Sequence, residues 1–395
     1  MRDYQYYKSA LQGIPLPYAF LDRDVLNENI HDILSRSKGK SIRLASKSIR
    51  SIGILRYIFQ ASPQFQGIMC YSPWEAIYLA EQGFQDLLLG YPVWDTTAIV
   101  AVTSKLKEDS PITFMVDCLD HVKHIEGIAE KEDVLIPLCV DLDMSSTMFG
   151  LHFGVHRSPL RTTVQALEVF KYIASSRYVY LDGIMGYEAQ IAGLGDRYPS
   201  QTVKNKIVRF LKERSIHEVV QRRSDIVREV RSLGIPYRFI NGGGTGSLRT
   251  TTSEEAVTEV TVGSGFYAPG LFDNYQDFRY QPALGFSIEI VRIPAPSIYT
   301  CLGGGYVASG ATGNDKLPKP YLPQEATLLK NEGAGEVQTP IMYKGEESLQ
   351  LGDPIFMRHS KAGELCERFT HLLIVSEGKV MDKVTTYRGD GACFL

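Results

Sequence analysis

The sequence predicts an α/β fold: a (β/α)8 barrel of the TIM type, followed by a C-terminal β-rich domain. Strand-like apolar runs alternate with helix-like segments about seven times over residues 24–270. Parallel strands need such crossover connections. After about residue 275 the pattern changes to glycine, proline and short β-type runs. An open doubly wound sheet would also fit the alternation, but the number of units and the span of about 250 residues favour the barrel.

The predicted elements follow one another along the chain. Residues 15–22 form an apolar run behind prolines, which predicts a strand. Residues 24–37 place Leu26, Ile30 and Ile33 on one helical face. Further strands are expected at 41–46, 66–71, 84–90, 112–116, 134–143, 179–185 and 237–240. Helices are expected at 49–60, 73–82, 96–106, 120–130, 159–175 and 201–233. Residues 376–379 (SEGK) are expected to turn a hairpin in the β-rich domain.

Composition argues against several classes of partner. The formal net charge is −3, from 42 basic and 45 acidic residues, so nothing suggests binding to nucleic acid or to an anionic membrane. The basic stretch 204–223 is interrupted by acids and is expected to be a solvated helix face. The six cysteines include no CxxC pair, which favours free thiols. With no apolar signal core or membrane-spanning run, we expect a cytoplasmic protein.

Lys47 is the first candidate for chemistry. It ends the predicted strand 41–46 in the sequence RLASKS, and barrel active sites lie at the carboxyl ends of the strands. A solvated surface lysine is the plainer alternative.

Glycine-rich turns come late in the barrel. Residues 241–247 (NGGGTGS) follow its last apolar strand, where exposed backbone N–H groups can hold a phosphate. Gly263 and Ser264 form a second small-residue turn that could close on the same phosphate. The pattern is neither a P-loop nor a dinucleotide-binding fingerprint, and a flexible turn is the alternative.

Residues 141–157 begin at the end of the predicted strand 134–143. Asp141, Asp143, His152 and His156 suggest a metal at first sight, but a glycine lies between the histidines and no HExxH motif is present. Arg157 is expected to pair with a phenolate or a carboxylate. In a later strand end, GYEAQ, Tyr187 could face the barrel mouth.

In the β-rich domain, His359 and Cys366 could hold zinc, but two ligands do not make a structural site and Lys361 between them would repel a cation.

Taken together, these segments resemble the D-threonine aldolase and D-serine dehydratase branch of the alanine-racemase-like (fold type III) pyridoxal-phosphate enzymes. The resemblance covers roughly residues 15–390 and depends on the order of seven motifs. These are PLPYAFLDRDVLNENI, RLASKS, YSPWEAIYLAEQGFQDLLLGYPV, VDLD with GVHRSPL, LDGIMGYEAQ, NGGGTGS and DPIFMRHSKAGELCERF.

The resemblance implies a barrel over residues 24–275 and a β-rich domain of residues 1–23 with 276–395, which takes in a strand around 19–22. Because relatives are generally homodimers, the resemblance also implies a homodimer. It implies pyridoxal 5'-phosphate bound to Lys47 as a Schiff base, with Arg157 and Tyr187 lining the cofactor. The phosphate would be held by Gly243, Gly244, Thr245, Gly263 and Ser264.

His359 matches the family's metal-binding histidine, but Lys361 stands where relatives have a cysteine or aspartate. A divalent metal is therefore in doubt, with Cys366 as a second ligand only if the loop folds differently.

The first hypothesis for function is a lyase acting on a β-hydroxy D-amino acid, by retro-aldol cleavage or by dehydration and deamination. Lys47 would be the base at Cα, and His359 with Lys361 would act at the β-hydroxyl. Racemisation or epimerisation is the second hypothesis and needs an acid or base on each face of Cα. A non-catalytic protein of vitamin B6 homeostasis is the third. The β-rich domain favours an enzyme with a small-molecule amino-acid substrate.

Overall fold

The computed structural model describes residues 2–148, 150–199 and 201–394, which separate into two compact units. The barrel unit comprises Leu34–Lys47, Ile58–Gly263 and Phe394–Leu395. The β-rich unit comprises Met1–Ile33, Ser48–Tyr57 and Ser264–Cys393. These units are groups of residues that contact one another more than they contact the rest of the chain. The division into a barrel domain of residues 24–275 and a β-rich domain of residues 1–23 with 276–395 stays a prediction.

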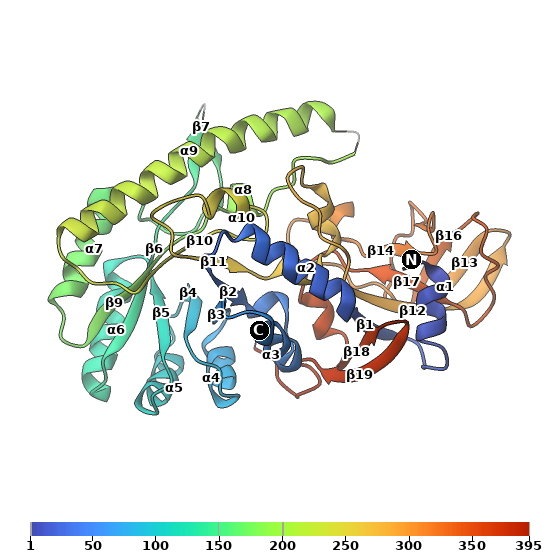
Figure 1. The fold of residues 1–395 in the computed structure, drawn as a ribbon, viewed down its shortest axis with the longest axis horizontal. Helices are drawn as coiled ribbons and strands as arrows, with labels where there is room; N and C mark the ends of the chain where they lie inside the picture. Colours follow the sequence, from blue (N-terminus) through green and yellow to red (C-terminus); the bar gives the residue numbers. More distant parts are fainter. Residues whose placement is uncertain (1, 149, 200, 395) are drawn as a thin grey trace. The chain divides into compact units, whose positions relative to one another are not determined.

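Eight parallel strands close the barrel, which confirms the predicted TIM-type architecture. Their order around the barrel is β10-β11-β2-β3-β4-β5-β6-β9 (Figure 1). The strands are β2 (Ser41–Ala45), β3 (Phe65–Cys70), β4 (Leu87–Pro92), β5 (Ile112–Val116), β6 (Ile136–Asp141), β9 (Val179–Gly186), β10 (Phe239–Gly242) and β11 (Glu259–Val262). Most of their residues are buried because helices cover the outside, which explains their nearly continuous apolar sequences.

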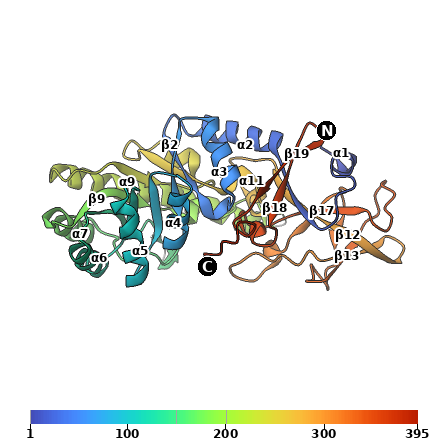
Figure 2. The same cartoon turned by 90° about the horizontal axis from the view of Figure 1, so that it is seen from below.

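Helices follow the strands as crossovers, and three of them begin at a capping side chain. The helices are α3 (Ile52–Ala61), α4 (Pro73–Glu81), α5 (Thr96–Lys107), α6 (Leu119–Glu132), α7 (Thr163–Ser175) and α9 (Thr202–Ser232). Figures 1 and 2 show α4 to α7 around the barrel strands. Ser72, Asp95 and Thr162 cap α4, α5 and α7 by accepting hydrogen bonds from backbone N–H groups in the first turn.

The middle of the barrel is apolar. Alternate residues of a strand point to the same face, and one interior cluster contains Leu88, Met115, Cys139, Met185 and Phe239. Gly183 is required here, because a Cβ at this position would lie 2.2 Å from the Phe239 ring.

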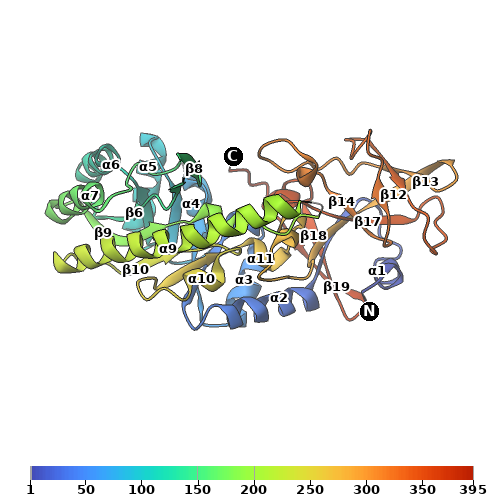
Figure 3. The same cartoon turned by 90° about the horizontal axis from the view of Figure 1, so that it is seen from above.

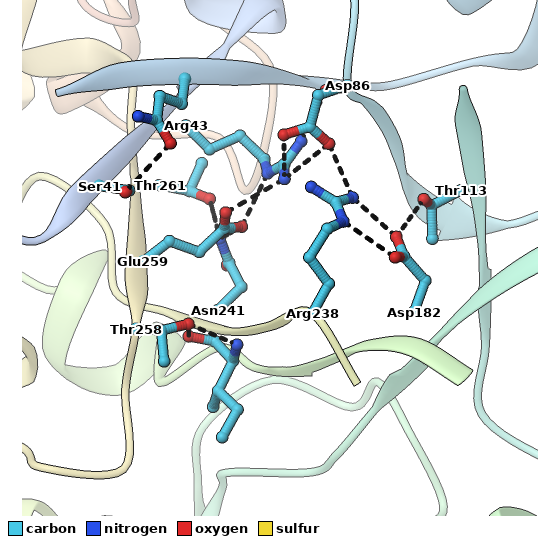
Figure 4. Close-up of polar contacts among 12 residues, drawn as sticks. Ser41, Arg43, Asp86, Thr113, Asp182, Arg238, Asn241, Thr258, Glu259 and Thr261 are labelled. Carbon is cyan, nitrogen blue, oxygen red and sulfur yellow. Dashed lines mark hydrogen bonds and ion pairs between the residues drawn. The ribbon is translucent and has the colours of Figure 1, made fainter. Parts of the chain in front are cut away.

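Charged groups fill the barrel where the strands begin (Figure 4). The Arg43 guanidinium donates to Glu259 at 2.7 Å and to the Asp86 carboxylate at 3.1 Å. Arg238 donates to Asp86 at 2.8 Å and to Asp182 at 2.7 Å. Arg43 is fully buried, so these pairs compensate a charge that would otherwise be costly to bury. The network lies at the end of the barrel that serves stability rather than chemistry.

The β-rich unit contains a nine-stranded sheet whose main path runs β15-β16-β13-β12-β1-β18-β19, with β17 paired to β12 and β14 paired to β17. Figure 3 shows its strands β12 to β14 and β17 to β19. Its strands are β1 (Tyr18–Asp22), β12 (Leu284–Ala295), β13 (Ile298–Leu302), β14 (Lys319–Leu322), β15 (Thr327–Leu328), β16 (Gln338–Met342), β17 (Pro354–Arg358), β18 (His371–Ser376) and β19 (Lys379–Thr385). The N-terminal strand β1 pairs with β12 and with β18, so the sheet takes in this strand as predicted. Strands β18 and β19 form the predicted hairpin.

Some features differ from the sequence-based expectation. Residues 4–10 form a helix, α1 (Tyr4–Ala10), and two three-residue strands, β7 (Ser146–Met148) and β8 (Leu151–Phe153), form a hairpin. The expectation of a fully solvated face on α9 is wrong for Lys212 and Arg223, which are buried. Among the described helices, none is both long and apolar enough to cross a membrane.

Candidate active site

The barrel gathers candidate residues at the carboxyl ends of its strands. Lys47 follows β2, Asp117 follows β5, Asp141 ends β6, Tyr187 follows β9 and Gly243 follows β10. Neighbouring strands are parallel throughout, so these ends all lie on one side of the barrel. This is the side on which barrels of this class carry their active sites.

Lys47 lies in a short 3-10 turn directly after β2. Its Nζ donates a hydrogen bond to the Tyr91 hydroxyl at 2.9 Å. Tyr91 comes from β4, and its position after an apolar strand run could have marked it in the sequence. Arg43 and Arg50 stand close to Lys47 in the sequence, but both guanidinium groups are paired with carboxylates, Arg50 with Glu367 at 2.6 Å.

Arg157 lies against two tyrosines. Its guanidinium carbon is 5.4 Å from the centre of the Tyr91 ring and 5.6 Å from that of Tyr187. Its Nε donates to an Asp141 oxygen at 2.6 Å, and a terminal nitrogen donates to the Gly90 carbonyl at 2.9 Å. Arg157 therefore does pair with a carboxylate, and this carboxylate belongs to the protein. The arrangement fixes a cation beside two aromatic rings.

Asp141 is fully buried, and burial raises its pKa to about 6 despite the neighbouring Arg157. The carboxylates of Asp117 and Asp143 raise the pKa further. Its second oxygen, Oδ1, has no hydrogen-bond partner among the described residues. Burial also raises the pKa of Tyr187 to about 12, so its hydroxyl keeps its proton near neutral pH.

The glycine turn after β10 comes close to other chain segments. Gly243 has a φ of +78°, which favours glycine. A Cβ at Gly244 would lie 3.3 Å from the Tyr187 ring. The Gly243 N–H donates to Glu188 at 3.3 Å and the Gly244 N–H to the Ser247 hydroxyl at 3.1 Å, while Thr245 is buried in the same turn.

Three buried charged residues, Arg223, Glu188 and Glu254, form a network next to this turn. Arg223, on α9, donates to Glu188 at 2.8 Å, to the Gly186 carbonyl at 2.7 Å and to Glu254. Glu188 in turn accepts hydrogen bonds from the hydroxyls of Ser247 at 2.6 Å and of Thr251 at 2.5 Å. No local sequence pattern marks this network, because its members lie on separate elements.

The second predicted turn begins at Gly263, directly after β11 ends at Val262. Ser264 starts the four-residue helix α11 (Ser264–Tyr267), and its hydroxyl lies 3.4 Å from that of Ser48. The two histidines of residues 141–157, His152 and His156, are exposed and stack on each other with ring centres 4.1 Å apart.

His359 follows β17 in the β-rich unit and is 3% exposed. Neither ring nitrogen makes a hydrogen bond of good geometry to a described residue, although the Leu284 backbone is close enough to favour the protonated ring. Burial and then the charge of Arg358 lower its pKa to about 3, so the imidazole is neutral at ordinary pH. It borders a cavity of about 430 Å³ that Lys361 and Glu364 also line.

The neighbours of His359 do not form the metal pair that the resemblance implies. The Lys361 ammonium donates to the Ser309 hydroxyl at 2.8 Å and lies 3.4 Å from Glu364. The Cys366 thiol donates to the Ile49 carbonyl at 3.5 Å, and burial raises its pKa to about 12, which disfavours the thiolate that a metal needs. A metal at His359 therefore stays a prediction.

Comparison with known proteins supports the resemblance. No protein-family model matches the sequence. The chain is 21% identical over 253 residues to a 3-hydroxy-D-aspartate aldolase of Paracoccus denitrificans. The match covers 64% of this chain and 60% of the aldolase, so this chain spans less than two thirds of that relative's length.

Two solved structures share the whole fold. The D-threonine aldolase of Filomicrobium marinum superposes with a TM-score of 0.80 at 15% identity, covering 95% of this chain and 96% of the aldolase. The D-threo-3-hydroxyaspartate dehydratase of Delftia sp. HT23 superposes with a TM-score of 0.76 at 15% identity, covering 96% and 99%. One structure of a D-threo-3-hydroxyaspartate dehydratase is of a variant in the metal-free form. These likenesses establish that the chain has the fold of these enzymes.

Proposed function

We propose that this chain is a pyridoxal-phosphate-dependent lyase acting on a β-hydroxy D-amino acid, by retro-aldol cleavage or by dehydration and deamination. The observation that carries the proposal is the Lys47 amine, which lies at the carboxyl end of a barrel strand and is hydrogen-bonded to Tyr91. The shared fold and the distant aldolase relative support the reaction class. Bound pyridoxal phosphate supplies an electron sink for the bond that breaks at the substrate Cα.

The residues of the barrel mouth fit this cofactor. Lys47 offers the amine for covalent attachment, and Arg157 and Tyr187 offer a cation and a ring to the cofactor face. The glycine turn at 243 and 244 has no side chains to cover its N–H groups, and with Thr245, Gly263 and Ser264 it would hold the phosphate. Two of these N–H groups already have acceptors within the chain, so phosphate binding would exchange those partners.

Each protein group has a definite task in the proposed reaction. The freed Lys47 amine moves a proton at the substrate Cα, and its hydrogen bond to Tyr91 orients it. An imidazole with so low a pKa is a weak base, so we assign His359 to accept a hydrogen bond from the β-hydroxyl. The Lys361 ammonium supplies positive charge at that oxygen, in place of a metal.

A spectrum and a substrate panel test the proposal. The protein purified with cofactor should show the visible absorption band of a lysine-bound pyridoxal Schiff base, and borohydride should fix the label to Lys47. Lys47→Ala should lose the band, whereas Lys123→Ala, at an exposed lysine of α6, should keep it. If no band forms even with added cofactor, the proposed chemistry is wrong.

The panel of D- and L-β-hydroxy amino acids distinguishes the reactions. Glycine plus an aldehyde identifies retro-aldol cleavage, and a 2-oxo acid plus ammonia identifies dehydration. His359→Gln should lower turnover at least about tenfold while the absorption band is kept, because the lost interaction acts at the β-hydroxyl. Inversion at Cα without cleavage would favour the racemase alternative, and binding of cofactor without turnover would favour the homeostasis alternative.

We also propose that the protein is a homodimer, as the resemblance implies, and that it acts in the cytoplasm on a small-molecule substrate.

A further inference from the structure

A group of three side chains of metal-ligating types lies at the carboxyl end of β5. Asp117, Cys118 and His121 each offer one donor atom, and these atoms all lie within 4.8 Å of one another. It is the only such group of three found among the described residues. The function proposed above uses none of these residues, so the inference does not depend on it.

Local backbone geometry brings the three side chains together. Strand β5 ends at Val116, and α6 begins at Leu119 with Cys118 as its N-cap in an extended conformation, φ −157° and ψ 165°. The Cys118 side chain makes no capping hydrogen bond, so its sulfur is not used by the helix. His121 occupies the third helical position, and N-cap and third-position side chains meet in the geometry of a capping box. Asp117 precedes the cap.

The donor atoms are already close to coordination spacing. His121 Nδ1 lies 2.9 Å from Asp117 Oδ1. Two ligands about 2.0–2.1 Å from one tetrahedral zinc ion are about 3.3 Å apart, so these two atoms need to separate only slightly to admit a cation. The side chains of Asp117 and His121 are 13% and 20% exposed, which leaves water access to the group.

The imidazole is also held in place from outside. The Trp94 ring meets His121 edge-on, with ring centres 5.8 Å apart, and stacks on His124 at 4.4 Å. His124 Nε2 is 2.9 Å from the Trp94 carbonyl oxygen, which ties the tryptophan to the same helix. A preoriented ligand loses less freedom when it binds.

We propose that Asp117, Cys118 and His121 bind one transition-metal ion, best fitted by Zn²⁺, with water as the fourth ligand. A thiolate, an imidazole and a carboxylate favour zinc over magnesium or calcium, which prefer oxygen ligands alone. Three protein ligands and one open position are typical of zinc sites that can exchange their fourth ligand. The simpler alternative is that His121 and Asp117 only cap the helix.

Cobalt(II) titration of the chelator-treated holoenzyme tests the site. Difference spectra against the metal-free sample should show a thiolate-to-cobalt charge-transfer band and the visible bands of four-coordinate cobalt at one equivalent. Cys118→Ser should abolish the charge-transfer band, and His121→Gln should weaken cobalt binding at least about tenfold. Zinc should displace cobalt and remove the bands.

Three matched variants complete the design. His217→Gln removes an exposed histidine of α9, Cys393→Ser removes the exposed thiol, and His359→Gln removes the buried histidine after β17. All three should bind cobalt as the wild type does. His121→Gln keeps the test valid if a Cys118 variant folds poorly, as judged by circular dichroism. A charge-transfer band that survives Cys118→Ser, or no binding by the wild type, would overturn the proposal.

Discussion

At the scale of single residues, the barrel mouth is organised around Asp141 and Arg157. Arg157 contacts two tyrosine rings and is held by a carboxylate that is itself completely buried. Burial destabilises the Asp141 carboxylate by more than the Arg157 charge stabilises it, because the pKa of Asp141 stays above its ordinary value. The protein therefore gives up stability to fix a cation where the cofactor is proposed to bind, which is common at functional sites.

This cost should appear in the pH dependence of stability. The Asp141 carboxyl loses its proton near pH 3.8 in the unfolded chain and near pH 6 in the folded one, so the folded state binds more protons between these values. Stability should therefore fall as pH rises, by about 2 kcal/mol from this group between pH 4.5 and 7.5. Asp141→Asn should remove that part of the slope in urea unfolding of the cofactor-free protein. Asp120→Asn, at an exposed position, should leave it unchanged; an unaltered slope in Asp141→Asn would contradict the assignment.

Sequence reasoning located residues that stand in recognisable motifs, and it missed those that work through other elements. Lys47 and the glycine turn each follow a strand, so their place at the barrel mouth could be inferred. Glu188 and Arg223 are 35 positions apart in the sequence and meet only after α9 has packed. A buried arginine on a helix rich in exposed charges leaves no local pattern, which is why Arg223 was expected to be solvated.

At the scale of elements, α9 supports the glycine turn. It spans 31 residues, and only part of its surface is buried. Through Arg223 it reaches Glu188 after β9 and Glu254 after α10 (Leu248–Thr251), so one side chain ties together the segments on both sides of the turn. Seven of the eight barrel strands could be predicted because each stands in a mainly apolar run, whereas β11 was missed because its four residues, EVTV, alternate polar and apolar side chains. The strands β7 and β8 could not, since three residues are too few for a periodic signal.

Removing the charge on α9 should destabilise the barrel. Arg223→Met leaves Glu188 and Glu254 buried without a counter-charge, and breaking such a pair costs about 3–5 kcal/mol. Urea unfolding should show this loss. Arg228→Met, at a residue of the same helix whose side chain is 66% exposed, should cost less than about 1 kcal/mol. Adding Glu188→Gln and Glu254→Gln to Arg223→Met should recover part of the stability. Equal effects of the two arginine variants would refute the role given to Arg223.

At the scale of the whole molecule, the proposed dimer can be tested on an apolar stripe of α9. Val203, Ile207 and Phe210 are 73%, 54% and 52% exposed, and their spacing places them along one side of the helix. Large exposed apolar side chains gathered in this way often mark an interface. The chain has a mass of 44.2 kDa, so sedimentation equilibrium should give twice that value.

The double variant Ile207→Asp with Phe210→Asp should shift this equilibrium toward the monomer, because burying two carboxylates in an interface is unfavourable. Val164→Asp is the matched control, since Val164 is 79% exposed on a different helix, α7. A monomeric wild type at micromolar concentration would contradict the dimer itself. If the double variant is still a dimer, the proposal of a dimer stands, but its interface does not include these residues of α9.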